Sequence, residues 1–97
     1  MISDLHPKAF LVAKVYYWNC RLNGKTSLLA GPFVSADLAE QCGDIVGYRA
    51  LDEHPELRGA TFGVVEMKAP GMGGGIYNEM LPQRLAGELL LDTGHRQ

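Results

Sequence analysis

The sequence lacks an apolar run long enough to cross a membrane. Its best run, residues 9–18, contains Lys14, whereas a spanning helix needs roughly 18 uninterrupted apolar residues. Asp4 and His6 precede this run and no small-residue cleavage site follows it, which argues against a secretory signal. We therefore expect a protein without membrane contact that stays in the cytoplasm of the cell that makes it.

Cysteine is scarce as well, and its spacing excludes the usual metal motifs. Cys20 and Cys42 do not form a C-x-x-C pair, and no histidine stands at ligand spacing from either of them. No metal ion and no cofactor is therefore predicted. A disulfide between the two cysteines stays open, although two buried free thiols suit a cytoplasmic protein better.

Two functional patterns are also missing from the sequence. It has no basic stripe of the kind that binds phosphate backbones, so nucleic-acid binding is disfavoured without being removed. Spacing brings no Cys–His or Ser–His pair together, and no pair of carboxylates stands in a recognisable apolar pocket. We therefore predict no catalytic residues and expect a protein that is not an enzyme.

What the chain does have is the composition of a folded domain. Of its 97 residues, 46% are apolar and 21% are charged, which is typical of globular proteins and predicts a single domain over residues 1–97. The ends, residues 1–8 and 92–97, are expected to be loosely ordered. Seven of the 11 acidic side chains fall within residues 36–66, a concentration that favours a basic partner.

The first half of the chain begins with a predicted hairpin. Residues 9–22 are rich in β-branched and aromatic side chains on both faces, which indicates a strand covered on both sides at least in part. Asn23-Gly24 then predicts a type I′ turn into a second strand over residues 25–30, ended by Gly31-Pro32. The two-residue turn fixes three expected cross-strand pairs: Leu22 with Lys25, Cys20 with Ser27, and Trp18 with Leu29.

A helical pattern follows the hairpin. Ser35 is a suitable N-cap, and one helix is predicted from residue 36 to His54-Pro55 at the latest. Within it, the spacing of Gly43 and Gly47 allows a close approach to a sheet or to another helix. A helix in this place and a hairpin before it indicate a mixed α+β protein.

The second half of the chain completes the predicted fold. A third strand is expected over residues 60–68 and a second helix over residues 81–91, while residues 76–80 fit either a short strand or the approach to that helix. The predicted order is therefore β-β-α-β with a C-terminal helix. We expect an α+β fold in which a three- or four-stranded, mainly antiparallel sheet carries helices on one face.

Aromatic side chains are concentrated in the first strand, at Tyr16, Tyr17 and Trp18. All three can belong to the core, or one face of the strand can be an exposed surface with aromatic anchors for a partner. Following the second interpretation, we predict six partner-binding residues, four at the hairpin and two near a glycine-rich loop: Tyr17, Trp18, Arg21, Lys25, Met72 and Tyr77.

The glycine-rich loop and the acidic segment are two further candidate surfaces. Ile76 stands where a dinucleotide fingerprint needs its third glycine, so the loop is predicted to be flexible, or to become ordered on a partner or a ligand phosphate. The acidic residues form either a solvated helix face or a docking face for a basic partner. The loop glycines are Gly71, Gly73, Gly74 and Gly75, and the acidic residues are Asp44, Asp52, Glu53 and Glu56.

Residues 15–46 carry a resemblance. A hairpin ending in Gly-Pro-Phe, at residues 31–33, feeds a helix that carries Ala36, Ala39 and Cys42. This pattern resembles small uncharacterised proteins of phages and plasmids. The resemblance implies an accessory protein of a mobile element, and some proteins of that kind inhibit host complexes such as CRISPR effectors by stoichiometric binding. It implies no functional residues.

Three functions follow from these observations. We expect first a non-enzymatic binding protein, including an inhibitor of a host complex that binds a protein partner. The alternatives are a small ligand- or nucleotide-binding oligomer, with a site at a subunit interface using residues 71–75, and a nucleic-acid-binding module. Because the first strand is apolar on both faces, its second face is expected to be buried by a homodimer or by the partner.

Overall fold

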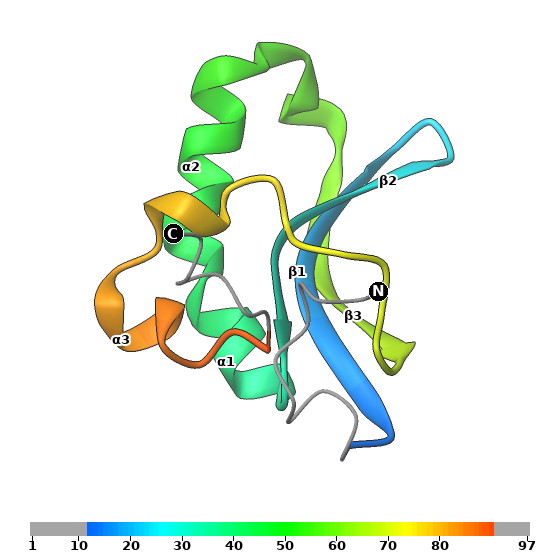
Figure 1. Ribbon diagram of the computed structural model, residues 1–97. Helices are drawn as coiled ribbons and strands as arrows, with labels where there is room; N and C mark the ends of the chain where they lie inside the picture. Colours follow the sequence, from blue (N-terminus) through cyan, green and yellow to red (C-terminus); the bar gives the residue numbers. More distant parts are fainter. Residues whose placement is uncertain (1–11, 91–97) are drawn as a thin grey trace.

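The structure is a computed structural model that describes residues 12–90. Three strands form one antiparallel sheet in the order β2-β1-β3: β1 (Lys14–Leu22), β2 (Lys25–Phe33) and β3 (Thr61–Lys68). Helices α1 (Ala36–Gln41) and α2 (Gly43–Glu53) lie together against the sheet (Figure 1). The predicted α+β class, with a three-stranded antiparallel sheet and helices packed against it, is therefore confirmed.

The hairpin turn has the geometry that its sequence predicts. Asn23 and Gly24 both have positive φ, 52° and 82°, as a type I′ turn requires. The pairs Leu22–Lys25 and Cys20–Ser27 are observed.

Further along β2 the prediction fails. Trp18 pairs with Ala30 instead of Leu29, and β2 continues through Gly31 and Pro32 to Phe33. The register shifts between Asn19 and Trp18 because β2 has one residue more than β1 there, as in a β-bulge. A strand can accommodate proline at such an irregularity.

The first helix begins as predicted but is divided. The Ser35 hydroxyl accepts a hydrogen bond from the Leu38 amide at 3.3 Å, which confirms the N-cap. The predicted single helix is interrupted at Cys42, which ends α1 and precedes α2. The break lies directly before Gly43, where an added Cβ would lie 2.8 Å from Trp18 Cζ2. The thiol of Cys42 donates to the Leu38 carbonyl oxygen at 3.4 Å.

The chain after α2 is less regular than predicted. A 3-10 turn, η2 (Pro55–Gly59), leads into β3, which agrees with the third predicted strand to within one residue. The predicted helix over residues 81–91 is reduced to α3 (Gln83–Ala86), which ends at Gly87, and the Leu90 amide then donates to the Pro32 carbonyl. Position 91 and the two ends that were expected to be loosely ordered lie outside the described residues.

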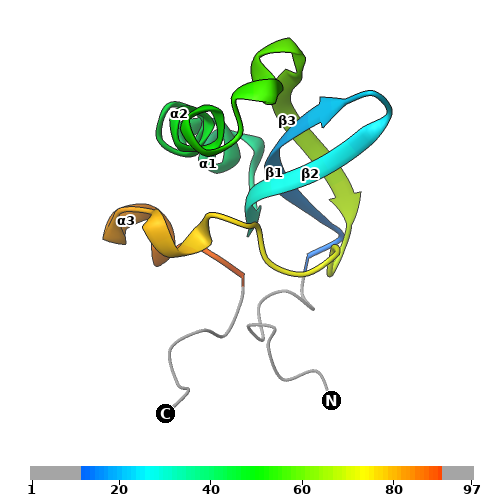
Figure 2. The same cartoon turned by 90° about the horizontal axis from the view of Figure 1, so that it is seen from above.

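Residues 75–77 run along the outer edge of β2. The amides of Gly75, Ile76 and Tyr77 donate to carbonyls of β2 residues at 2.8 to 3.0 Å. The chain then enters a short 3-10 turn, η3 (Asn78–Met80), so residues 76–80 are neither a regular strand nor a helix. Figure 2 shows the segment after β3 returning past β2 toward α3. One edge of the sheet is therefore occupied.

Both faces of β1 are covered by the chain itself. On the helix face, Cys20 packs with residues of α1, α2 and α3. On the other face, Val15 and Tyr17 are fully buried and cluster with Leu90, Val65 and Met67. The apolar second face was the reason to expect a homodimer, and the chain's own packing removes that reason.

The longest helix among residues 12–90 is α2, and none of the helices in this range is long and apolar enough to span a bilayer.

Candidate partner-binding groove

Tyr17 is a core residue, contrary to its predicted role as a surface anchor. Its relative exposure is 0%, and its hydroxyl donates to the Gly73 carbonyl and accepts from the Met72 amide at 3.0 Å. Partial desolvation of the phenol raises its pKa above the ordinary value. The side chain therefore holds the glycine-rich segment against the sheet and offers no surface to a partner.

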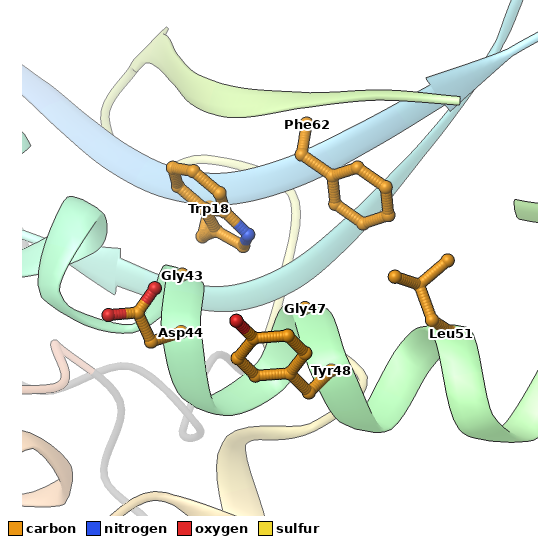
Figure 3. A pocket seen from close by; sticks show the side chains of 7 residues that line it. All are labelled: Trp18, Gly43, Asp44, Gly47, Tyr48, Leu51 and Phe62. Atoms are coloured by element: carbon orange, nitrogen blue, oxygen red, sulfur yellow. The ribbon is translucent and has the colours of Figure 1, made fainter. Parts of the chain in front are cut away.

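Trp18 points to the opposite face and forms the floor of a groove between α2 and β3 (Figure 3). The groove has a volume of about 190 Å³ and its lining is mainly apolar. Seven residues line it, five of them from α2 on one side and Phe62 from β3 on the other: Trp18, Gly43, Asp44, Gly47, Tyr48, Leu51 and Phe62.

Two glycines of α2 position the indole ring. Gly43 and Gly47 are four residues apart, so they lie on the same side of the helix. A Cβ atom on Gly43 would lie 2.8 Å from Trp18 Cζ2, whereas one on Gly47 would lie 3.8 Å from Trp18 Nε1. The first distance is too short for any side chain, and the second is an ordinary contact. Gly43 is therefore required for α2 to pack on the ring.

The indole N–H of Trp18 has no hydrogen-bond partner among the described residues, although the nitrogen is buried. Figure 3 shows this nitrogen on the side of the ring that faces Gly47 and Tyr48. An unpaired buried donor costs about 1–3 kcal/mol. An oxygen atom from a bound molecule that reached this N–H would recover part of that free energy.

The walls of the groove expose apolar surface. The side chain of Tyr48 is 69% exposed. Outside the groove lining, Val64, which pairs with Trp18 across the sheet, is 37% exposed. Leu51 and Phe62 are half-buried. A large aromatic side chain held at the rim of a preformed apolar groove is a typical anchor for a protein partner.

The predicted acidic face is divided between the two ends of α2. Asp44 lies in the first turn and lines the groove, while Glu53 lies in the last turn, about 13 Å away along the helix axis. Glu53 accepts from Arg49 at 3.2 Å and from the Tyr77 hydroxyl at 2.8 Å, and Glu56 lies 3.5 Å from His54. Of the four predicted acidic residues, only Asp44 and Asp52 remain available near the groove to attract a basic partner; Asp52 lies one helical turn from Tyr48.

The other predicted anchors do not join this site. Arg21 and Lys25 are exposed at the hairpin end of the sheet. Met72 is 75% exposed in the segment that covers Tyr17, on the face of the sheet opposite to the groove. Tyr77 is half-buried beside Glu53, at the far end of α2. Of the six predicted residues, the structure places only Trp18 in the groove.

The glycine-rich segment is packed against the sheet at its two ends, Gly71 and Gly75. Gly71 and Gly73 have φ of 88° and 93°, and a Cβ on Gly75 would lie 2.5 Å from the backbone of Ala30. The amides of Gly71, Met72 and Gly75 already donate to groups within the protein, at 3.0 Å each. Three of the five amides in this loop are thus unavailable to a ligand phosphate. Gly71 and Gly75 serve close packing here, whereas a Cβ on Gly73 would meet no atom within 4 Å. Gly74 is exposed in the same segment.

A second cavity, of about 200 Å³, lies on the β2 side of α2. Its lining includes Cys20, Ser27, His54 and Glu56, a set of groups that sequence spacing did not bring together. Burial raises the pKa of the Cys20 thiol, which favours the protonated form over the nucleophilic thiolate. Cys20 and Cys42 are both buried free thiols, which agrees with the favoured interpretation of the sequence.

The comparisons with known proteins add no relative, because no family model, no curated protein and no solved structure matches the chain. The groove is therefore interpreted from its geometry alone. Sequence reasoning missed Tyr48, Leu51 and Phe62 as its walls. The available signal was the Gly43–Gly47 spacing, which predicted a close approach but did not identify Trp18 as the group approached.

Proposed function

We propose that this protein is a non-enzymatic binding protein whose groove between α2 and β3 receives a protein partner. The observation that carries the proposal is the buried, unpaired indole N–H of Trp18 at the floor of an apolar groove. Native proteins pair nearly all such donors, and this unpaired donor beside an apolar groove is explained if a bound partner shifts the groove wall and supplies the acceptor.

The size of the groove supports a partner side chain over a free small molecule. Its volume of about 190 Å³ is below the roughly 300–1,000 Å³ typical of small-molecule pockets. Tryptophan and tyrosine are enriched among residues that dominate interface energetics, and here Trp18 is held by a helix and a sheet while Tyr48 extends from the rim. An anchor of one or two partner residues suits these dimensions.

Inhibition of a host complex is a more specific form of the same function. A small protein that occupies a functional surface of a larger one needs a rigid anchor and no catalytic group. Stoichiometric binding through the groove would meet that need. The mobile-element origin remains a prediction from the resemblance of residues 15–46.

Site-specific photo-crosslinking in the cells that produce the protein tests this function. A photoreactive benzophenone side chain replaces Tyr48, and a matched control carries it at Thr26, an exposed residue of the hairpin. We expect one defined protein adduct from position 48 and none from position 26. The adduct should disappear when Gly47→Leu fills the groove. Equal labelling from both positions, or labelling that survives Gly47→Leu, would show that the groove is not the docking site.

A further inference from the structure

We infer that the segment of the partner that docks here is extended and basic, and that it pairs with the free edge of β3 as a fourth strand. This inference rests on the proposed function and specifies the partner's chemistry. The sheet has the order β2-β1-β3, and residues 75–77 occupy the outer edge of β2. Among residues 12–90, no backbone group pairs with the outer edge of β3.

The register shows which backbone groups of β3 face outward. The Ala69 amide donates to the Ala13 carbonyl at 3.0 Å, directly beyond the Lys14–Lys68 pair. Hydrogen-bonded pairs alternate along an antiparallel ladder, so the inward-bonding residues of β3 are the odd-numbered ones from 61 to 67. The N–H and C=O groups of Phe62, Val64 and Glu66 therefore point away from β1.

The same residues share a face with the groove. Phe62 lines the groove, and side chains two apart on a strand lie on one face, which places Val64 and Glu66 beside it. An added strand would lie about 4.8 Å from β3. The partner residues opposite Phe62 and Val64 would project to the groove face. A long side chain at either of these partner positions would extend over Phe62 and Val64 toward Trp18. Strand addition thus delivers side chains to the groove at every second position.

The charges near the groove favour a basic segment. Asp44 lines the groove and Asp52 flanks it, both are exposed, and neither is in an ion pair within the described part of the chain. Glu66, on the edge itself, is 2.9 Å from Lys14 and is locally compensated. A lysine or arginine of the partner that reached Asp44 or Asp52 would meet an uncompensated carboxylate. This attraction would speed the association of the two proteins and help to fix the register of the added strand.

Val64 provides a substitution specific to the edge. Because its N–H faces solvent, Val64→Pro removes an outward donor without removing a bond to β1, and proline is tolerated at such edge positions. Val64→Thr is the matched control, since it keeps a β-branched side chain and the N–H. Thermal unfolding of both variants establishes that they are folded before binding is compared.

The probe is a library of random twelve-residue peptides displayed on phage and selected on the immobilised full chain. We expect recovered peptides to alternate apolar residues with others and to carry lysine or arginine. Binding to the soluble protein should change the fluorescence of Trp18, the only tryptophan. Val64→Pro should weaken binding at least about tenfold, the effect of losing one or two hydrogen bonds, and Val64→Thr, which keeps the N–H, should weaken it much less.

N-methylated peptides test the pairing independently of how the variants fold. Methylation of the alternate amides that face β3 should abolish binding, and methylation of the other amides should not. Loss of binding in Gly47→Leu with full binding in Val64→Pro would retain the groove and overturn strand addition. Strand addition would also be overturned, with the groove retained, if position 48 gave a protein adduct but no peptide was selected. Selection of acidic or helical peptides would have the same meaning. A dimer in light scattering that Val64→Pro dissociates would assign the edge to a second copy and also overturn the inference.

Discussion

At the scale of residues, two neighbouring aromatic side chains have different roles because a strand alternates its faces. Tyr17 points away from the helices, and its hydroxyl is hydrogen-bonded to the backbone of the glycine-rich segment. Trp18 points toward α2, where two glycines admit its ring but no group of the described residues accepts its N–H. The first residue is structural, and the second is the centre of the proposed binding groove.

Tyr17→Phe tests the structural role. The substitution removes a hydroxyl that donates to Gly73 and accepts from Met72, and it leaves the Met72 amide without that partner. We expect the free energy of unfolding to fall by about 1–3 kcal/mol in urea denaturation. Tyr48→Phe, at an exposed side chain, is the control and should change it by less than about 0.5 kcal/mol. Equal stability of the two variants would contradict the role of Tyr17.

At the scale of elements, α2 joins the core and the groove through a single helix face. Its buried residues Val46 and Ala50 pack in the core, and the adjacent Gly43 and Gly47 contact the indole. Val46 and Ala50 are four residues apart, the spacing that places two side chains on one face of a helix. The break at Cys42 was not predicted; it lies directly before Gly43, whose backbone lies against a ring in another strand.

The two glycines of α2 are expected to respond to alanine with opposite signs. Gly43→Ala places a Cβ 2.8 Å from Trp18, so the ring or the helix must shift and stability should fall. At Gly47 the Cβ would lie at 3.8 Å, and alanine there should stabilise the helix by about 0.5–1 kcal/mol through its higher propensity. Thermal unfolding of both variants measures the difference. A loss of stability in Gly47→Ala similar to that in Gly43→Ala would mean that the helix lies closer to the ring than described.

At the scale of the whole molecule, the C-terminal half returns to close the structure around β1 and β2. It covers the second face of β1, occupies the outer edge of β2 and reaches the end of α2, where the Tyr77 hydroxyl donates to Glu53 at 2.8 Å. The only sheet edge that the described residues leave free is therefore that of β3. Among the described residues, the edge of β3 and the groove beside it are thus left for the strand addition that we propose.

This closure has a consequence for stability at high pH. Desolvation, together with the hydrogen bond to Glu53, raises the pKa of Tyr77 from 10.0 to about 12. A group whose pKa is higher in the folded state stabilises the fold fully below its unfolded pKa and loses that contribution as the pH rises through the folded value. We therefore expect stability to decline between pH 10 and 12 through this residue. Tyr77→Phe should flatten that decline in urea denaturation across this range, and an unchanged slope would contradict the assignment.

Local patterns in the sequence determined most of the architecture. Asn23-Gly24 determined the turn because few residues adopt positive φ at two successive positions, and Ser35 determined the helix start because its hydroxyl caps a free amide. Only tertiary structure decided the site. The burial of Tyr17, the seating of Trp18 on Gly43 and the free edge of β3 depend on contacts between segments far apart in the chain. Periodicity shows which side chains share a face, whereas packing decides what covers that face.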